Sequence, residues 1–496
     1  MKPSCVGWRP TLSGIALVAA LSVSAQAQLI SLKTVPVAAG DQFLLFPSHN
    51  LGMGGVSIAL DDAVLDPFVN PAKGGRLGQA HVFAAPVYYD VSNNAGSAGA
   101  LSAGALFGGR IFGGGMVALQ QIKRGDVFFG PVPLWDVAIL PPNALSQRSA
   151  TNKYGFLTIG TRLPGDLNVA ASGFFADLNA IDGVEHLYAM ASSIDQSGDL
   201  QDLRLGLTKT FAGERTLEAV ALYRRFDMQH DVTYVDWVVV DSLNWIWEQR
   251  TRVEANVDKT DTWGLHVGYV QPIGRHGWRV GGTLTGNWKD HPKIPNYEIM
   301  NIPRDPGHST AFDIGVGVAK VAGPTTFGID IVYEPGTSDT WAEAEEAIGT
   351  ASGGTIPPGG RTIENEFGFS NAFVNVGLAR AVGPAVLQLG LGLRAYDYEL
   401  DQWDHVAETA RRQSEQWIEW VPSWGARVQW GDLEVRYAGR VTTGTGRPGT
   451  AWDGGVAVRA EDFASANDIL LAPSGPLTLQ DVTVVTNQLS VSIPLR

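Results

Sequence analysis

The sequence has little of several features that define other classes of protein. Its 496 residues include a single cysteine, Cys5, and only 17% of them are charged. The lone cysteine excludes a disulfide-stapled scaffold, and the low charge together with 9% aromatic residues excludes a disordered chain. After the N-terminal region, no run of about 20 apolar residues occurs, so no membrane-spanning helix is expected. Glycine and tryptophan are abundant, with 59 and 15 residues, as is typical of a large β protein.

The first 27 residues have the pattern of a secretory signal. Lys2 and Arg9 precede an apolar stretch over 11–23, which is followed by Ser24-Ala25-Gln26-Ala27. A basic start, a short apolar core and an A-x-A ending predict cleavage before Gln28. An N-terminal membrane anchor is the alternative, but its apolar core would be too short. The exported chain would then have no cysteine.

Charge and motif content narrow the function. Without residues 1–27, the chain keeps 34 basic and 50 acidic residues, a net charge of −16, which would repel nucleic acid. G-x-S-x-G and H-E-x-x-H motifs are absent, and the nine histidines are scattered, so we expect no enzyme, no metal and no cofactor. An enzyme with a serine and a histidine on neighbouring strands would have no linear motif and stays a minor alternative.

A repeated pattern begins at residue 80, in which alternating segments are joined by short glycine-containing turns and long polar connections in turn. Glycine and proline supply the backbone angles that a short hairpin needs. The short turns lie at 108–110, 164–166, 212–214, 274–277, 322–324, 382–384 and 431–432. The long connections lie near 125–150, 177–199, 227–258, 290–308, 336–362, 400–415 and 444–481. This alternation is typical of membrane hairpins, with turns on the periplasmic side and loops outside.

Individual segments alternate with a period of two. Leucines alternate with polar residues and glycines over 385–396, and Trp278 and Trp288 share one face of 278–288. At about 3.3 Å per residue and a tilt near ~40°, these two tryptophans are separated by about 25 Å along the membrane normal, the height of an apolar band. A soluble propeller or sandwich is the alternative, but its connections need not sort into short and long ones.

The segments define the predicted fold: an all-β, transmembrane, antiparallel, up-and-down β-barrel over 80–496. Closure of the barrel leaves no unpaired edge in lipid. Sixteen segments fit the pattern, with fourteen strands as the alternative count. They are 80–91, 98–107, 111–124, 151–163, 167–176, 200–212, 216–226, 259–273, 278–289, 309–322, 325–335, 363–382, 385–399, 416–430, 433–443 and 482–496.

Residues 28–79 do not fit this repeat. Their sequence resembles the N-terminal signature of FadL-type hydrophobic-compound transporters and PorV-type outer-membrane proteins. The matching residues are Phe43, Leu44, Leu45 and Pro47; Gly52, Met53, Gly54, Gly55 and Ala59; Asp61 and Asp62; and Asn70, Pro71 and Ala72. Two residues depart from the family pattern, Val56 in place of Ala and Lys73 in place of Gly. The family barrels have fourteen strands, which also differs from our count.

The resemblance implies that residues 28–79 form a hatch in the periplasmic mouth of the barrel. Its glycines would allow close packing against the wall, and Asn70-Pro71 would fix a turn. The glycine cluster lacks the Lys-Ser/Thr pair of a phosphate-binding loop. The candidate hatch residues are Gly52, Gly54, Gly55, Asp61, Asp62, Asn70, Pro71 and Ala72.

If the apolar faces point to lipid, several arginines point into the lumen. Four of them lie on the neighbouring segments of 385–443 and form a basic wall, and charges in a confined lumen need partners or water. We hypothesise that hatch residues Asp61, Asp62 and Asp66 pair with these arginines. Alternatively, the arginines line a solvated pore and pair with Glu434 and other acids of the wall. The candidate lumen residues are Arg279, Arg394, Arg427, Arg436 and Arg440.

The long connections are rich in tryptophan and acidic residues. Trp237, Trp245 and Trp247 lie in one connection and Trp403 in another, and the AEAEEA stretch at 342–347 suggests a short helix. Exposed aromatic side chains over a barrel mouth could capture an apolar ligand, dock a protein partner, or pack on one another as a cap. All three alternatives stay open.

These patterns predict a protein of the Gram-negative outer membrane, in contact with its lipid. By resemblance, its function is passive passage of small hydrophobic compounds, with a hydrophobic small molecule as ligand. The alternative is a non-conducting scaffold for an exported or secretion-system protein. A general porin is a third option, which the hatch argues against.

Overall fold

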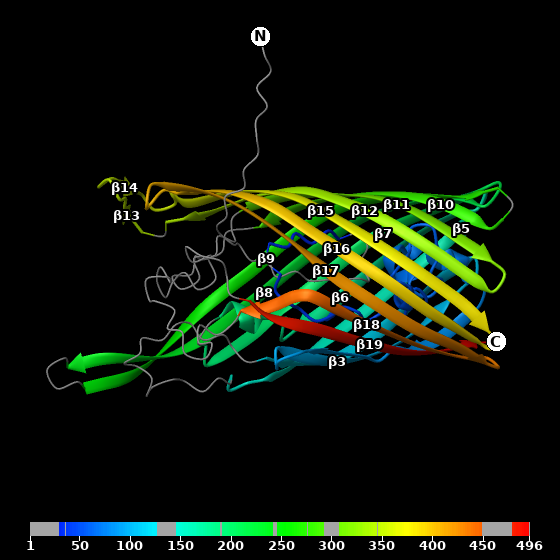
Figure 1. Cartoon of the computed structure of the whole chain (residues 1–496), viewed down its shortest axis with the longest axis horizontal. Helices are drawn as coiled ribbons and strands as arrows, with labels where there is room; N and C mark the ends of the chain where they lie inside the picture. The colour runs from blue at the N-terminus through cyan, green and yellow to red at the C-terminus, as the bar shows by residue number, and fades with distance from the viewer. Residues whose placement is uncertain are drawn as a thin grey trace, which may run out of the picture.

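The chain forms a closed β-barrel in a computed structural model (Figure 1). The structure describes residues 29–34, 36–125, 145–188, 191–241, 246–274, 276–291, 307–344, 346–448 and 479–495. The predicted signal segment and Trp245 lie outside these residues. Neighbouring strands in the barrel are antiparallel. Each strand pairs with the strands before and after it in the chain, as an up-and-down barrel requires.

The barrel strands vary widely in length. Their bounds are β1 (Ala80–Ala84), β2 (Val87–Val91), β3 (Gly96–Phe107), β4 (Ile111–Arg124), β5 (Ser149–Leu163), β6 (Leu167–Leu178), β7 (Ser193–Phe211), β8 (Arg215–Asp241), β9 (Ile246–Ile273), β10 (Trp278–His291), β11 (Gly307–Ala322), β12 (Thr325–Glu343), β15 (Arg361–Val382), β16 (Ala385–Asp404), β17 (Thr409–Trp430), β18 (Leu433–Pro448) and β19 (Leu479–Leu495). A separate small hairpin contains β13 (Ile348–Gly349) and β14 (Thr355–Ile356).

The barrel closes between its first and last strands. Strands β1 and β2 each pair with β3 on one side and with β19 on the other, so they are two halves of one strand interrupted at Ala85-Pro86. Proline has no N–H to donate to a ladder, which accounts for the break. With these halves counted as one, the barrel has sixteen strands. The predicted fold class and strand count are confirmed, and the alternative of fourteen is wrong.

Several predicted loops are strands instead. Most of 227–258 belongs to β8 and β9, and most of 400–415 belongs to β16 and β17. Above the membrane both faces of a strand contact water, so the apolar alternation that marks a strand in the sequence is lost there. The predicted helix at 342–347 is also wrong, because Ala342 and Glu343 end β12.

Side chains face the directions that the alternation predicts. On β16, Leu389 is 64% exposed on the outer surface, whereas Arg436 and Arg440 of β18 point inward and are 4% and 5% exposed. Trp278 and Trp288 both lie on the outer surface of β10. The barrel therefore has an apolar outside, as a membrane barrel requires, and an inside that carries polar residues on β16–β18 and a buried aromatic cluster on β5 and β6. Among the described residues, no helix is long and apolar enough to cross a membrane.

The hatch lies inside the barrel, mainly toward the end with the short turns (Figure 1). It contains three short helices, η1 (Leu51–Met53), α1 (Asp66–Val69) and η2 (Pro71–Arg76). Phe46 stacks on Phe68 with ring centroids 4.4 Å apart, and both rings contact Phe156 of β5. A fourth short helix, η4 (Val184–Leu187), lies between β6 and β7. The aromatic cluster fixes the hatch to one side of the lumen.

Residues 36–38 of the hatch also extend the sheet. In the described residues, the ladder between β17 and β18 ends at Trp420 and Thr443, although both strands continue. Beyond this point Val37 forms a parallel bridge with Gly446. The N–H of Ala38 donates to the carbonyl of Gly446 at 2.6 Å. Residues 36–38 thus pair with β18 where β17 has separated from it.

A lysine on the outer surface tests the orientation of the barrel. We expect Leu389→Lys to destabilise the folded barrel by about 2–4 kcal/mol, because a lysine near the bilayer midplane loses its hydration. Leu163→Lys, which lies next to the 164–166 turn, is the matched control and should cost about 0–1 kcal/mol. Denaturant titration of folding into lipid vesicles measures both values. Equal costs at the two depths would contradict the assigned lipid-facing surface.

Candidate functional site

A cavity of about 320 Å³ lies in the lumen between the hatch and the barrel wall. The hatch contributes apolar side chains to its lining, among them Leu44, Phe46, Leu51, Leu65 and Val69, and as many polar or charged ones, among them Lys33, Asp62, Asp66 and Lys73. The wall contributes side chains from β8, β9, β10, β11, β12 and β15–β18, many of them polar or charged. The cavity therefore has a mixed lining on its hatch side and is polar on much of its wall side.

The glycines of the hatch allow its close approach to the wall. A Cβ atom on Gly52 would lie 2.8 Å from the Cα of Gly425 in β17, so no larger residue fits without movement. Gly54 and Gly55 have φ angles of +73° and +75°, in the left-handed region that glycine adopts without strain. The N–H of Gly54 donates to the hydroxyl of Ser423 at 2.9 Å. The structure thus places these three predicted residues at the contact with β17 and in the turn that follows η1.

Asp62 organises the turns of the hatch. Its carboxylate is buried and accepts five hydrogen bonds from the hatch itself, from the Ser48 hydroxyl and from the backbone N–H groups of His49, Asn50, Val64 and Leu65. Charge-assisted bonds of this kind are stronger than neutral ones. The hypothesis that Asp62 pairs with the basic wall therefore does not match the contacts that its oxygens make.

Asp61 makes the predicted type of contact with the wall. Its carboxylate accepts hydrogen bonds from Arg279 of β10 at 2.8 Å and from Arg76 of the hatch at 3.0 Å. Burial alone would raise the pKa of Asp61, but the positive charges of Arg279 and Arg76 outweigh burial and hold it below its usual value. The Asp61 side chain remains nearly half exposed, so this pair contributes little to stability.

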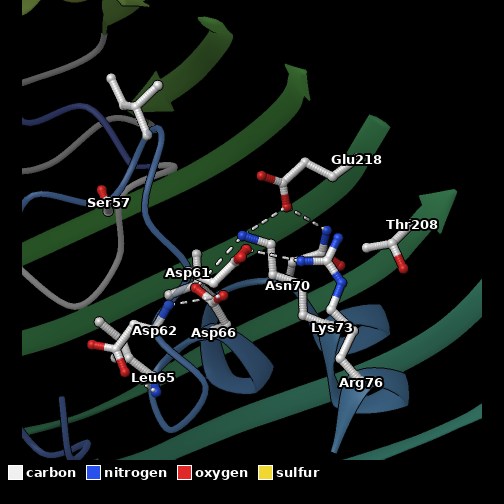
Figure 2. A network of polar contacts seen from close by, with 12 residues as sticks. Ser57, Asp61, Asp62, Leu65, Asp66, Asn70, Lys73, Arg76, Thr208 and Glu218 are labelled. Atoms are coloured by element: carbon white, nitrogen blue, oxygen red, sulfur yellow. Dashed lines mark hydrogen bonds and ion pairs between the residues drawn. The ribbon is translucent and has the colours of Figure 1, made fainter. Parts of the chain in front are cut away.

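Asn70 and Lys73 connect the hatch to β8 (Figure 2). The Asn70 amide donates to Glu218 Oε2 at 3.0 Å, and its carbonyl oxygen accepts from the N–H of Ala72 at the start of η2. Lys73 Nζ lies 3.1 Å from Glu218 and 3.5 Å from Asp66. The network contains Lys73, one of the two residues that depart from the family pattern.

The environment of Asp66 is unusual for a carboxyl group. Burial raises its pKa to about 7; the positive charge of Lys73 opposes this shift, and the negative charges of Asp62 and Glu218 add to it. The pKa of Lys73 is raised by Asp66 and Glu218 despite its own burial. Because Glu218 is closer to Lys73 than Asp66 is, the ammonium remains paired when Asp66 is protonated.

The predicted basic wall on β16–β18 is paired in several ways. Arg440 binds Asp41 of the hatch, with Nε donating to Asp41 Oδ2 at 2.8 Å. Arg394 lies 3.8 Å from Glu419, and Arg436 lies 3.0 Å from Glu434. Arg427 is opposite Arg436 in the β17–β18 ladder. The contacts therefore include both hypothesised types, pairing with a hatch acid and pairing with wall acids.

Sequence reasoning missed several residues of this site. Asp41, Lys33 and Glu218 each form an ion pair between the hatch and the wall, with Arg440, Glu419 and Lys73 respectively. The partners of Asp41 and Lys33 lie 399 and 386 residues away in the chain. The alternation of β8 places Glu218 on the inward face, which was the one sign in the sequence that it belongs to this site. That position alone did not identify Lys73 as its partner.

A closed antiparallel barrel with an apolar outside, a partly polar lumen and an inserted N-terminal segment defines the class of plugged outer-membrane-type β-barrels. No protein-family model matches the chain, and no curated protein matches it in sequence. Among solved structures, a FadL homologue from Pseudomonas aeruginosa is 10% identical, with 92% of this chain and 100% of that chain covered and a TM-score of 0.44.

Two further solved structures show a similar level of likeness. The CymD monoaromatic hydrocarbon channel is 8% identical, with 92% of this chain and 99% of that chain covered and a TM-score of 0.42. The toluene transporter TbuX from Ralstonia pickettii is 9% identical, with 90% and 97% covered and a TM-score of 0.38. Likeness at this level assigns no function to the chain.

Two aspartates of the hatch provide a matched pair for mutation. We expect Asp62→Ala to lower the free energy that keeps the hatch in place by about 3 kcal/mol, because five donors lose a charged acceptor. Asp61→Ala should cost less than about 1 kcal/mol, since its pairs are exposed. Hydrogen exchange of hatch amides in the reconstituted barrel measures both. Undiminished protection in Asp62→Ala would refute the role given to this carboxylate.

The raised pKa of Asp66 makes the seating of the hatch dependent on pH. A released hatch would lose the Asp66 proton near pH 4, whereas the seated hatch keeps it to about pH 7. Raising the pH through this window therefore favours release, by up to about 4 kcal/mol. Protease protection of the hatch should fall between pH 4 and 8 more steeply in the wild type than in Asp66→Asn. Identical pH profiles would show that Asp66 does not titrate there.

Proposed function

We propose that the protein is an outer-membrane channel for passive passage of small, predominantly hydrophobic molecules. The observation that carries this proposal is the cavity of about 320 Å³ between the hatch and the wall. Its volume lies at the lower end of the range of small-molecule pockets, which are mostly apolar with a few polar groups. The N-terminal resemblance to FadL-type hydrophobic-compound transporters supports the same assignment.

The contacts of the hatch suggest how a molecule would pass. The aromatic cluster around Phe46 and Phe68 holds the hatch on one side of the lumen, while the opposite contacts with β10–β12 and β15–β18 combine polar contacts with smaller apolar clusters. A polar contact between protein groups is worth only about 1 kcal/mol net, because water replaces it. Displacement of the hatch from this side would break these polar contacts and the small apolar clusters beside them, and would open a path from the cavity toward the periplasm.

The alternative function, a non-conducting scaffold, is supported by a different observation. Strands β8 and β9 contain 27 and 28 residues, far more than the roughly 9–11 needed to cross a bilayer, and their hairpin projects beyond the other barrel strands (Figure 1). A hairpin of this length offers a surface for a protein partner. Co-purification of a defined exported protein, lost on shortening the hairpin, would favour this alternative.

Filling the cavity tests the channel function. Val332 of β12 lines the cavity, and Val332→Trp should reduce passage of a small aromatic solute by about tenfold or more, because the indole occupies the cavity volume. Val316→Trp on the outer surface of β11 is the matched control and should leave passage unchanged. Proteoliposome swelling with benzyl alcohol measures the rate. Equal rates for the two variants would contradict passage through this cavity.

A further inference from the structure

We infer that the cavity holds a positively charged group of its ligand against an acidic wall formed by Asp313, Asp330 and Glu334. This inference rests on the proposed function and narrows its substrate class. The ligand would be a small amphiphilic cation, with an apolar body against apolar hatch residues such as Leu44 and Phe46 and an ammonium group on the wall side. All three carboxylates line the cavity.

The acidic wall follows from the register of β11 and β12. Asp330 and Glu334 lie on the inward face of β12, four positions apart. The ladder pairs Ile314 of β11 with Tyr333 of β12, so the next positions, Asp313 and Glu334, lie opposite each other. Like charges directly opposite each other in a sheet are destabilising. The fold therefore concentrates negative charge at one side of the lumen at a cost in stability.

No cationic side chain among the described residues forms an ion pair with these three carboxylates, although the charges of Lys289 and Arg394 act on Glu334 from a greater distance. Asp330 is only 2% exposed; its Oδ2 accepts the N–H groups of Ser57 at 2.6 Å and Ile58 at 3.1 Å. Its Oδ1 is buried and has no hydrogen-bond partner. Glu334 is 9% exposed. A buried carboxylate without a counter-charge is costly, and a bound cation would offset that cost.

The basic side chains in and around the cavity are held by other groups. They are Lys33 and Arg394, which pair with Glu419; Lys73, which pairs with Glu218; Arg440, which pairs with Asp41; and Lys289, which donates to the carbonyl of Ile30. Lys33, Lys73, Arg394 and Arg440 are thus paired with acids outside the acidic wall, whereas Lys289 binds a carbonyl oxygen and its charge acts on Glu334. Asp313 and Asp330 receive no such compensation, and their side of the lumen favours a positive ligand.

The surroundings of the acidic wall fit an organic cation. Val332 lies between Asp330 and Glu334 on the same face of β12, and Phe373 lines the same cavity. Aromatic faces attract cations, and aliphatic side chains bury an apolar body. Among the described residues, no three His, Cys, Asp or Glu side chains are placed to hold a metal ion. An ammonium group, which can be bound by one or two carboxylates, suits this geometry.

Matched aromatic solutes test the inference. The full chain is reconstituted in liposomes, and swelling rates are measured for benzylammonium and for benzyl alcohol, which has nearly the same size and no charge. We expect benzylammonium to enter the wild type about tenfold faster, a difference of about 1.4 kcal/mol. The double variant Asp313→Asn/Glu334→Gln should lose this preference. Asp339→Asn, an exposed position on the same strand, should keep it.

The outcomes separate the inference from the proposed function. If the wild type admits both solutes at equal rates, or if the double variant keeps the preference, the acidic wall does not select cations, and the inference fails while the channel function stands. If neither solute enters faster than into empty liposomes, the channel function fails and the inference with it. Should the double variant not fold, as judged by heat-modifiable gel mobility, Asp313→Asn alone must reduce the preference by about threefold.

Discussion

A chain that crosses a bilayer as strands must satisfy every backbone hydrogen bond within the protein, because hydrocarbon offers no partner. Closure through β1, β2 and β19 meets this requirement, and the rest of the structure depends on it. Closure sends alternate side chains to lipid and to the lumen. Leucines can lie outside without cost, but every inward arginine or carboxylate must then find a counter-charge, a hydrogen bond or water in a confined space.

The hatch supplies many of these partners. Arg440 and Arg279 of the wall meet Asp41 and Asp61 of the hatch, and the reverse pairing occurs between Glu218 and Lys73. The hatch is therefore an electrostatic complement of the lumen as well as a plug. The acidic wall on β11 and β12 is the exception, because none of its carboxylates forms an ion pair with a cationic side chain of the described residues. We therefore place the ligand of the proposed channel there.

Much of the barrel could be predicted because its signals are local. Period-two alternation and the parity of short and long connections predicted the sixteen strands and the outward face of Leu389. The extensions of β8 and β9 were missed, because strands with both faces in water lose the apolar alternation. The hatch was found by resemblance, and Lys73 was noted there only as a departure from the family pattern. Its ion pair with Glu218, 145 positions along the chain, carries no local signal.

The sequence by itself determined which side chains face lipid, where the chain turns and how many strands there are, since each depends on neighbours within a few residues. Only the tertiary structure decided which charges meet. Asp62 binds the hatch backbone rather than the wall, Asp41 reaches Arg440, and Asp313 comes to lie opposite Glu334. These contacts depend on strand register and barrel closure, which bring together residues that are far apart in the chain.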